Sequence, residues 1–119
     1  AMRRTDSYRL SRIEEIGSQL MGLIDDGTVT RELLLDDFKM QWMVTTPLYN
    51  IGEQVYALSD ELKSSHPEVP WSGISGLRHR LVHDYEGTNW SIVTSIVFDE
   101  VPAFLEQVSR IRRTILEEG

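Results

Sequence analysis

Apolar side chains recur at steps of three and four residues through most of this 119-residue chain. The first such stripe consists of Leu10, Ile13, Ile16, Leu20, Leu23 and Ile24. This spacing places the apolar residues along one side of an α-helix, while charged residues such as Glu14 and Glu15 fall on the other side. We therefore expect an amphipathic helix that ends near Asp25-Asp26-Gly27.

A second periodic stretch follows Thr30, a residue type that is favoured at helix N-caps. Its apolar residues are Leu34, Phe38, Trp42, Leu48, Ile51, Val55, Leu58 and Leu62. The rhythm slips by two residues between Trp42 and Leu48, and Pro47 lies in that gap. Because proline lacks an amide hydrogen and crowds the preceding turn, we expect either one helix kinked near Pro47 or two helices in sequence.

The second half of the chain begins with a loop over residues 64–70, because its two prolines cannot continue a helix. We expect a shorter helix after this loop, with Gly87 as its stop. Its apolar stripe consists of Ile74, Leu77 and Leu81.

Residues 90–98 fit both the alternation of a strand and a helix face with Asn89 as the cap. We favour the helix, because a lone strand would have nothing to pair with. Pro102 suits the first turn of a final helix. The stripe of that helix consists of Leu105, Val108, Ile111 and Ile115. Together these segments predict an all-α fold, an antiparallel bundle of four to five helices.

Length and charge limit the classes of function. A chain of 119 residues has room for one domain with one core. Its net charge of -7 gives no broad attraction for polyanions, so a nucleic acid would have to be held by a local patch. The absence of cysteine excludes disulfides, thiolate metal sites and cysteine nucleophiles.

Membrane insertion and secretion are not expected. The longest stretches without charge, residues 40–52 and 87–98, are shorter than the roughly 20 residues that a membrane helix requires. The first residues carry charges where a signal peptide needs an apolar run, so a cytoplasmic location is the default expectation. We interpret residues 1–2, Ala1 ahead of Met2, as left by an expression vector.

The segment 77–85, with the sequence LRHRLVHDY, contains two of the three histidines, two arginines and a tyrosine. One interpretation is a solvated basic helix face beside the core stripe. His79 and His83 are four residues apart and could share a metal ion, but no third ligand lies at a matching spacing. We therefore expect neither a metal site nor a cofactor.

The flanks of this segment carry a resemblance to a known family. The stretches concerned are Val69-Pro70-Trp71, Ile74-Ser75-Gly76-Leu77-Arg78, Arg80-Leu81-Val82-His83-Asp84-Tyr85, Asn89-Trp90, Asn50-Ile51-Gly52-Glu53, Leu58-Ser59-Asp60-Glu61-Leu62-Lys63 and Asp99-Glu100-Val101-Pro102. Together they resemble the HepT-like branch of the HEPN domain family, over about residues 7–116. The centre of the likeness is an arginine, four residues, a histidine, one residue and a tyrosine, here Arg78, His83 and Tyr85.

The resemblance implies a single HEPN-like helical domain over residues 3–119 that forms a homodimer. It implies the toxin of a toxin-antitoxin pair, a metal-independent ribonuclease that cuts RNA in a cleft where the two motifs face each other. The antitoxin of such pairs is a small MntA-like nucleotidyltransferase, which would silence the toxin by transferring AMP to Tyr85. Many members have asparagine after the motif arginine, where this chain has His79.

The residue types suit metal-free RNA cleavage. Histidine titrates near neutrality, so His83 can act as the acid/base residue. Arginine stays charged and offers a planar fork to phosphate oxygens, so Arg78 can stabilise the phosphate, with His79 and Arg80 adding RNA contacts. Glu53 is a candidate for orienting Arg78 or a histidine; the alternative is an exposed helix carboxylate.

The spacing of the motif presents a difficulty. On a straight helix Arg78 and His83 are about 140° apart. Either the helix loosens before Gly87, or the length of the arginine bridges the gap, or a second subunit supplies half of each site.

Two other functions share the same fold. One is a non-catalytic subunit that presents nucleotide or substrate to a nucleotidyltransferase, and the other is a structural adaptor. In either case Tyr85 could simply pack its ring on the rim of the bundle. Trp42, Trp71 and Trp90 are expected as core or interface anchors rather than as base-stacking platforms.

Overall fold

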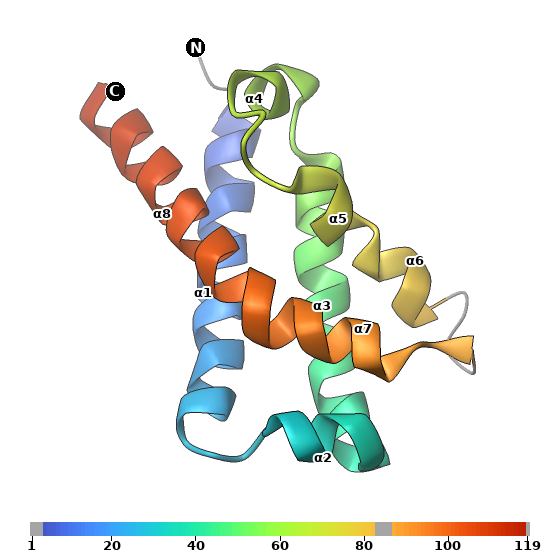
Figure 1. Ribbon diagram of the computed structural model, residues 1–119. Helices are drawn as coiled ribbons and strands as arrows, with labels where there is room; N and C mark the ends of the chain where they lie inside the picture. Colours follow the sequence, from blue (N-terminus) through green and yellow to red (C-terminus); the bar gives the residue numbers. More distant parts are fainter. Residues whose placement is uncertain (1–3, 83–86, 119) are drawn as a thin grey trace.

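The computed structural model describes residues 4–82 and 87–118 (Figure 1). These residues form helices and connecting turns, with no strand among them, which confirms the all-α prediction. The elements are α1 (Arg4–Asp25), α2 (Arg31–Asp36), α3 (Phe38–Ala57), α4 (Asp60–Ser65), α5 (Trp71–Ser75), α6 (Leu77–Val82), α7 (Trp90–Ser95), the π-helical turn η2 (Ile96–Glu100) and α8 (Val101–Glu118). The long rods are α1, α3 and the continuous run of α7, η2 and α8, and α2, α4, α5 and α6 are short helices between them.

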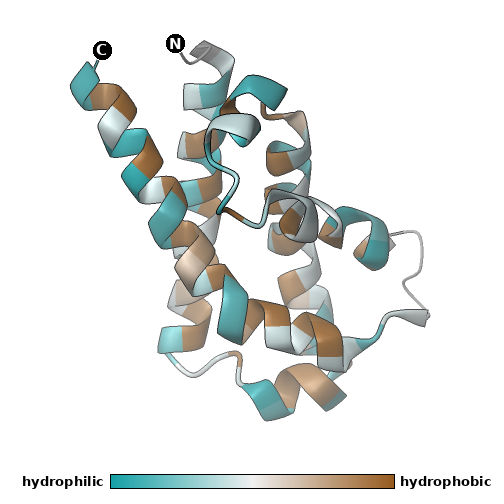
Figure 2. Cartoon of the chain, turned by 45° about the horizontal axis from the view of Figure 1, so that its top comes forward, coloured by the Kyte–Doolittle hydropathy of each residue, from teal (hydrophilic) through white to brown (hydrophobic). Residues whose placement is uncertain are grey.

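The first and last helices follow the apolar periodicity. Leu10, Ile13 and Leu20 on α1 are fully buried, and α1 ends at Asp25 as expected. The turn that follows contains Gly27 at a φ of 83°, a left-handed conformation that glycine adopts at little cost. Figure 2 shows the brown apolar faces of the rods turned toward one another, so one core lies between them.

The second periodic stretch is divided into three helices, α2, α3 and α4. The breaks lie at Asp37 and at Leu58–Ser59 rather than near Pro47. Thr30 caps α2 as predicted, since its side chain accepts a hydrogen bond from the Leu33 amide at 3.2 Å. Asp37 leaves the helical conformation and caps α3, accepting from the Lys39 amide at 2.8 Å. A carboxylate at an N-cap accepts hydrogen bonds from the free amides in the first turn of a helix. Asp37 therefore favours the start of a new helix at this position.

Helix α3 continues through Pro47. A proline inside a helix removes one backbone hydrogen bond and so destabilises the helix. Burial of apolar side chains on either side of the proline can offset this loss of stability. Val44, Leu48 and Ile51 are buried on both sides of Pro47 and hold α3 against the core.

Two aromatic residues expected on the buried stripe are exposed instead. Phe38 and Trp42 are 55% and 60% exposed, and their rings contact each other edge to face with centroids 4.9 Å apart. Helix α3 is a separate helix from α2, and Val44 and Leu48 lie on its buried face. Trp42 lies about 120° around the helix from Leu48, so it points away from that face. Trp42 is therefore not a core residue, and its expected role as an interface anchor stays a prediction. Trp71 is buried and Trp90 packs against the core.

The single helix expected after the loop is instead two short helices, α5 and α6, separated at Gly76. The loop itself begins after Ser65, where α4 ends. Residues 90–95 are helical, and Asn89 caps α7 by accepting from the Ile92 amide at 3.2 Å. Pro102 lies in the first turn of α8. The expected stop at Gly87 follows the residues 83–86 that lie outside the described part. Within that part, no helix is long and apolar enough to cross a membrane.

Candidate active site

Helix α6 carries the arginine-rich segment and packs directly on α3. Gly52 makes this close approach possible. A Cβ atom at Gly52 would lie 3.2 Å from the Arg78 amide nitrogen and 3.3 Å from the Ile74 carbonyl oxygen, both tighter than ordinary contacts. On the core side, Leu77 and Leu81 are buried. The position of Arg78 is therefore fixed by backbone packing against the middle of α3.

The Arg78 side chain lies across the outer face of α3. Its Nη1 atom is 3.3 Å from Glu53 Oε1, and its Cζ atom is 3.6 Å from the centroid of the Tyr56 ring. The ion pair is partly open to solvent, with the Arg78 and Glu53 side chains 33% and 41% exposed. Contact with the face of the ring uses none of the guanidinium N–H groups, so Arg78 retains donors for a further oxyanion ligand.

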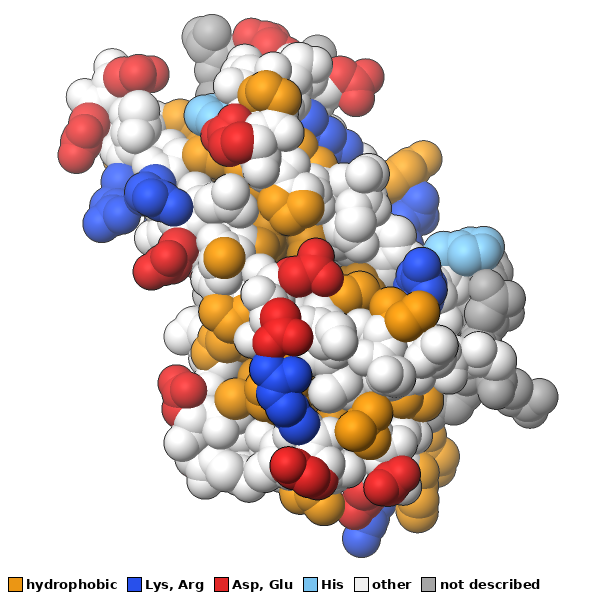
Figure 3. All heavy atoms as spheres, viewed as in Figure 1, with side chains coloured by type: hydrophobic (Ala, Val, Ile, Leu, Met, Phe, Trp, Pro, Cys, Tyr) orange, Lys and Arg blue, Asp and Glu red, His pale blue; other side chains and the backbone are white. Residues whose placement is uncertain are grey.

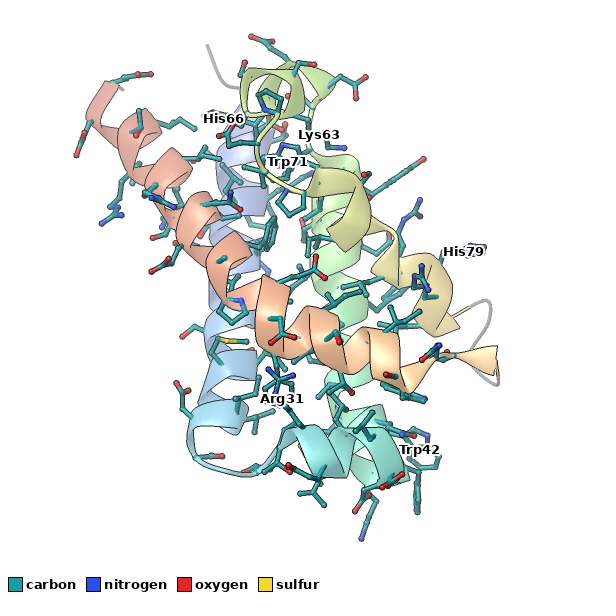
Figure 4. The ribbon with its side chains drawn as sticks, viewed as in Figure 1. Arg31, Trp42, Lys63, His66, Trp71 and His79 are labelled. Carbon is teal, nitrogen blue, oxygen red and sulfur yellow. The ribbon has the colours of Figure 1, made fainter. Side chains whose placement is uncertain are left out.

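His79 and Arg80 lie on the outer side of α6 and are exposed. Figure 4 shows His79 at the edge of the molecule, away from the core. The carbonyl oxygen of Arg80 accepts a hydrogen bond from Thr88 Oγ1 at 3.0 Å, which ties α6 to the residues that precede α7. The structure thus places Arg78, His79 and Arg80 on one short helix but brings only Arg78 against Glu53.

His83 and Tyr85 lie outside the described residues, as does Asp84 between them. Whether the His83 imidazole meets the Arg78 guanidinium therefore stays a prediction. Among the described side chains, Arg78 is directed toward Glu53 on α3, whereas His79 is exposed.

Sequence reasoning missed Tyr56. The available signal was its position three residues after Glu53, because side chains three apart on a helix are neighbours. A side chain on the same face of the helix as Glu53 is a candidate to contact Arg78 as well, and Tyr56 is such a side chain. The sequence alone did not indicate that α6 would lie across this face.

The third histidine is part of another region. His66 follows α4, where its Nδ1 atom is 3.6 Å from Glu68 Oε1 and its carbonyl oxygen accepts from Trp71 Nε1 at 2.9 Å. Figure 4 shows His66 near the top of the molecule and His79 at its right-hand edge. No group of three His, Asp or Glu side chains that could hold a metal ion occurs within residues 4–82 and 87–118.

The charge distribution around α6 differs from that of the chain as a whole. Figure 3 shows basic side chains and a histidine along the right-hand edge, over α5 and α6, with carboxylates prominent at the top and bottom of this face. On a protein with a net charge of -7, such a local group of cations is suited to attract an anion.

Comparisons with known proteins agree with one another. The family model for "Ribonuclease HepT-like" matches residues 10–111. A candidate RNase of Methanocaldococcus jannaschii is 36% identical over 87 residues, which cover 73% of this chain and 72% of the relative. A candidate ribonuclease HepT of Thermococcus cleftensis is 30% identical over 88 residues, covering 71% and 80%. No solved structure matches the chain significantly.

Proposed function

The chain belongs to the HepT-like ribonuclease family, and from this premise we propose that it cleaves RNA without a metal ion at a centre carried by α6. The resemblance of the motif, the match of the family model over residues 10–111 and the names of the relatives support a ribonuclease. In this proposal Arg78 stabilises the reacting phosphate and His83 transfers protons.

The reaction follows from the chemistry of these two groups. The 2′-hydroxyl of a ribose attacks the adjacent phosphorus, the bond to the 5′-oxygen of the next nucleotide breaks, and a cyclic phosphate is formed. His83 takes the hydroxyl proton or donates one to the leaving oxygen, and water exchanges the other proton; such a proton transfer contributes about 10²- to 10⁴-fold in enzymes. The Arg78 guanidinium binds the oxygens on which negative charge increases.

The observation that carries this assignment is the held guanidinium of Arg78. Glu53 and Tyr56 both contact it, and the side chain remains one-third exposed. An arginine that served only as a solvated surface charge would need no such partners. His79 and Arg80, exposed on the same helix, would add contacts to the RNA strand.

We further propose that the active form is a homodimer in which two α6 segments face one cleft. Pairing Arg78, His79 and Arg80 with their copies concentrates positive charge that one acidic chain lacks. Exposed apolar side chains on α2 and α3 also favour contact with another chain. These side chains are Leu33, Leu35, Phe38, Trp42 and Met43.

Regulation is proposed to act on Tyr85. Transfer of AMP to its hydroxyl would place a phosphodiester and a nucleotide near Arg78, where they would occupy the place of the substrate. The transferring enzyme would be an MntA-like nucleotidyltransferase, and the pair would function as toxin and antitoxin.

Cleavage of RNA in excess EDTA tests the ribonuclease. Wild-type protein should cut, and Arg78→Ala and His83→Ala should each lose about 100-fold or more of the rate. Arg113→Ala, which removes an exposed arginine from α8, is the matched control and should cut as the wild type does. Circular dichroism and light scattering show whether each variant keeps its fold and its dimer.

The intact mass decides how an inactive protein is interpreted. Suppose that the wild-type protein has its unmodified mass, does not cut RNA and associates tightly with the nucleotidyltransferase. This result would contradict the ribonuclease and favour the non-catalytic binding subunit. Co-expression with the transferase should add one adenylate to the wild type and none to Tyr85→Phe. Full activity in a verified monomer would remove the dimeric site.

A further inference from the structure

Beside Arg78, a second cation lies over the same exposed aromatic ring. Tyr56 is 59% exposed, and its ring centroid is 3.6 Å from Arg78 Cζ and 6.0 Å from Lys63 Nζ. We call Glu53, Tyr56 and Lys63, from α3 and α4, the Tyr56 platform. The motif contains none of the three residues.

The position of Lys63 is determined by the corner between α3 and α4. The buried carboxylate of Asp6 accepts hydrogen bonds from the Ser59 amide at 2.9 Å and the Ser59 hydroxyl at 2.6 Å. Ser59 in turn caps α4. Lys63 Nζ then donates to the Tyr56 carbonyl oxygen at 3.1 Å, in the last turn of α3. The hydrogen bonds at this corner therefore hold Lys63 over the Tyr56 ring.

The platform leaves hydrogen-bond donors for an anion. Lys63 has three N–H donors and gives one to the Tyr56 carbonyl, while Arg78 has five and directs Nη1 to Glu53. Stacking on the Tyr56 ring uses none of them. Glu53 balances one of the two cations, so the platform with Arg78 keeps one net positive charge on an acidic protein.

We propose that the Tyr56 platform is the part of the RNA-binding site that lies next to the cleavage centre, an inference that rests on the ribonuclease function proposed above. Lys63 binds a phosphate that neighbours the scissile one. Tyr56 is a positioning residue, which holds the Arg78 guanidinium plane so that its remaining N–H groups point to the scissile phosphate. Single-stranded RNA thus runs from α6 across the end of α3 toward α4.

Binding of a non-cleavable RNA tests Lys63 apart from catalysis. The probe is a single-stranded oligonucleotide methylated at every 2′-oxygen, followed by fluorescence anisotropy between about 50 and about 200 mM salt. Lys63→Gln should weaken binding about fivefold near 0.1 M salt and reduce the slope of log K against log salt by about 0.7, the value for one phosphate of a single strand. Lys63→Arg should retain the slope. Lys39→Gln removes the other lysine, at the opposite end of α3, and should change neither quantity.

Cleavage of unmodified RNA tests Tyr56. Tyr56→Leu should lower kcat about two- to fivefold, the loss expected for one exposed cation–π contact. Tyr56→Phe keeps the ring and should restore kcat, which a role of the hydroxyl would not allow. Lys63→Gln should raise KM with kcat unchanged, because it removes binding that is equal in ground and transition states.

The outcomes separate this proposal from the previous one. If Lys63→Gln behaves as Lys39→Gln in salt slope and KM, or if Tyr56→Leu cuts as well as Tyr56→Phe, the platform is refuted while cleavage stands. If wild-type protein of unmodified mass binds the methylated probe with the expected dependence on Lys63 but does not cut unmodified RNA, the platform stands as a binding surface and the ribonuclease is refuted. If the wild type binds no RNA, both are refuted.

Discussion

Replacing Gly52 by alanine tests whether the close packing of α6 on α3 positions Arg78. An alanine in the interior of a helix is ordinarily more stable than glycine by about 1 kcal/mol. At Gly52 the added Cβ would lie 3.2 Å from the Arg78 amide nitrogen, 3.3 Å from the Ile74 carbonyl oxygen and 3.4 Å from Arg78 Cβ. Two of these atoms belong to the backbone, so α5 and α6 must move by a few tenths of an ångström.

The net effect is the difference between two terms of similar size. Overpacking of a well-packed site costs about 1–3 kcal/mol. The gain in helix propensity offsets about 1 kcal/mol of that. We therefore expect Gly52→Ala to lower the free energy of unfolding by up to about 2 kcal/mol. A misplacement of 1 Å costs about 100-fold in rate, so a shift of a few tenths of an ångström should lower cleavage by less than about tenfold.

Gly22→Ala is the matched control. Gly22 also lies inside a long helix, α1, but an added Cβ there meets no atom within 4 Å. This variant should be stabilised by about 0.5–1 kcal/mol with unchanged cleavage. Urea unfolding followed by circular dichroism gives both values, and cleavage of one RNA substrate gives the rates. Equal stabilisation of the two variants, with equal cleavage, would refute the packing argument.

Three further predictions concern stability and its dependence on pH. Phe104 is fully buried, so Phe104→Ala should lower the free energy of unfolding by about 3–5 kcal/mol, measured by urea unfolding, and a loss below about 1 kcal/mol would contradict its place in the core. Asp6→Asn should cost about 1.5–3 kcal/mol, because it weakens the charged hydrogen bonds to Ser59, and an unchanged urea midpoint would argue against them. The hydrogen bond from Arg31 lowers the pKa of Asp99, so its stabilisation is present above about pH 4 and is lost as the pH falls through the lowered value. Asp99→Asn should therefore lower the melting temperature at neutral pH but not in strong acid, and a difference that persists in acid would show that the ion pair is not its cause.

Local sequence signals were sufficient for several helix boundaries. The periodic stripe of α1, the cap at Thr30 and the cap at Asn89 are all present as predicted. Such signals act over a few residues, because a cap satisfies amides of its own first turn and a stripe reflects one helix at a time. Asp37 is the same kind of signal, because aspartate is favoured at helix N-caps. The break was nevertheless predicted near Pro47.

Local signals did not give the orientation of α3. Phe38 and Trp42 fit an apolar stripe by spacing, yet both are exposed. Which side of a helix is buried depends on the neighbours that pack against it, and these come from distant parts of the chain. The neighbours of α3 include α1, α5 and α6.

For the candidate site, the sequence by itself determined the residue types and the family, through Arg78, His83, Tyr85 and their flanks. The sequence also offered Glu53 as a partner of Arg78 or of a histidine, but tertiary structure decided that Glu53 contacts Arg78 and that Tyr56 joins it. Because α6 is seated on α3 over Gly52, Glu53 and Tyr56 contact Arg78, and the turn into α4 adds Lys63. These side chains are far from Arg78 along the chain, so only packing of whole helices could bring them together.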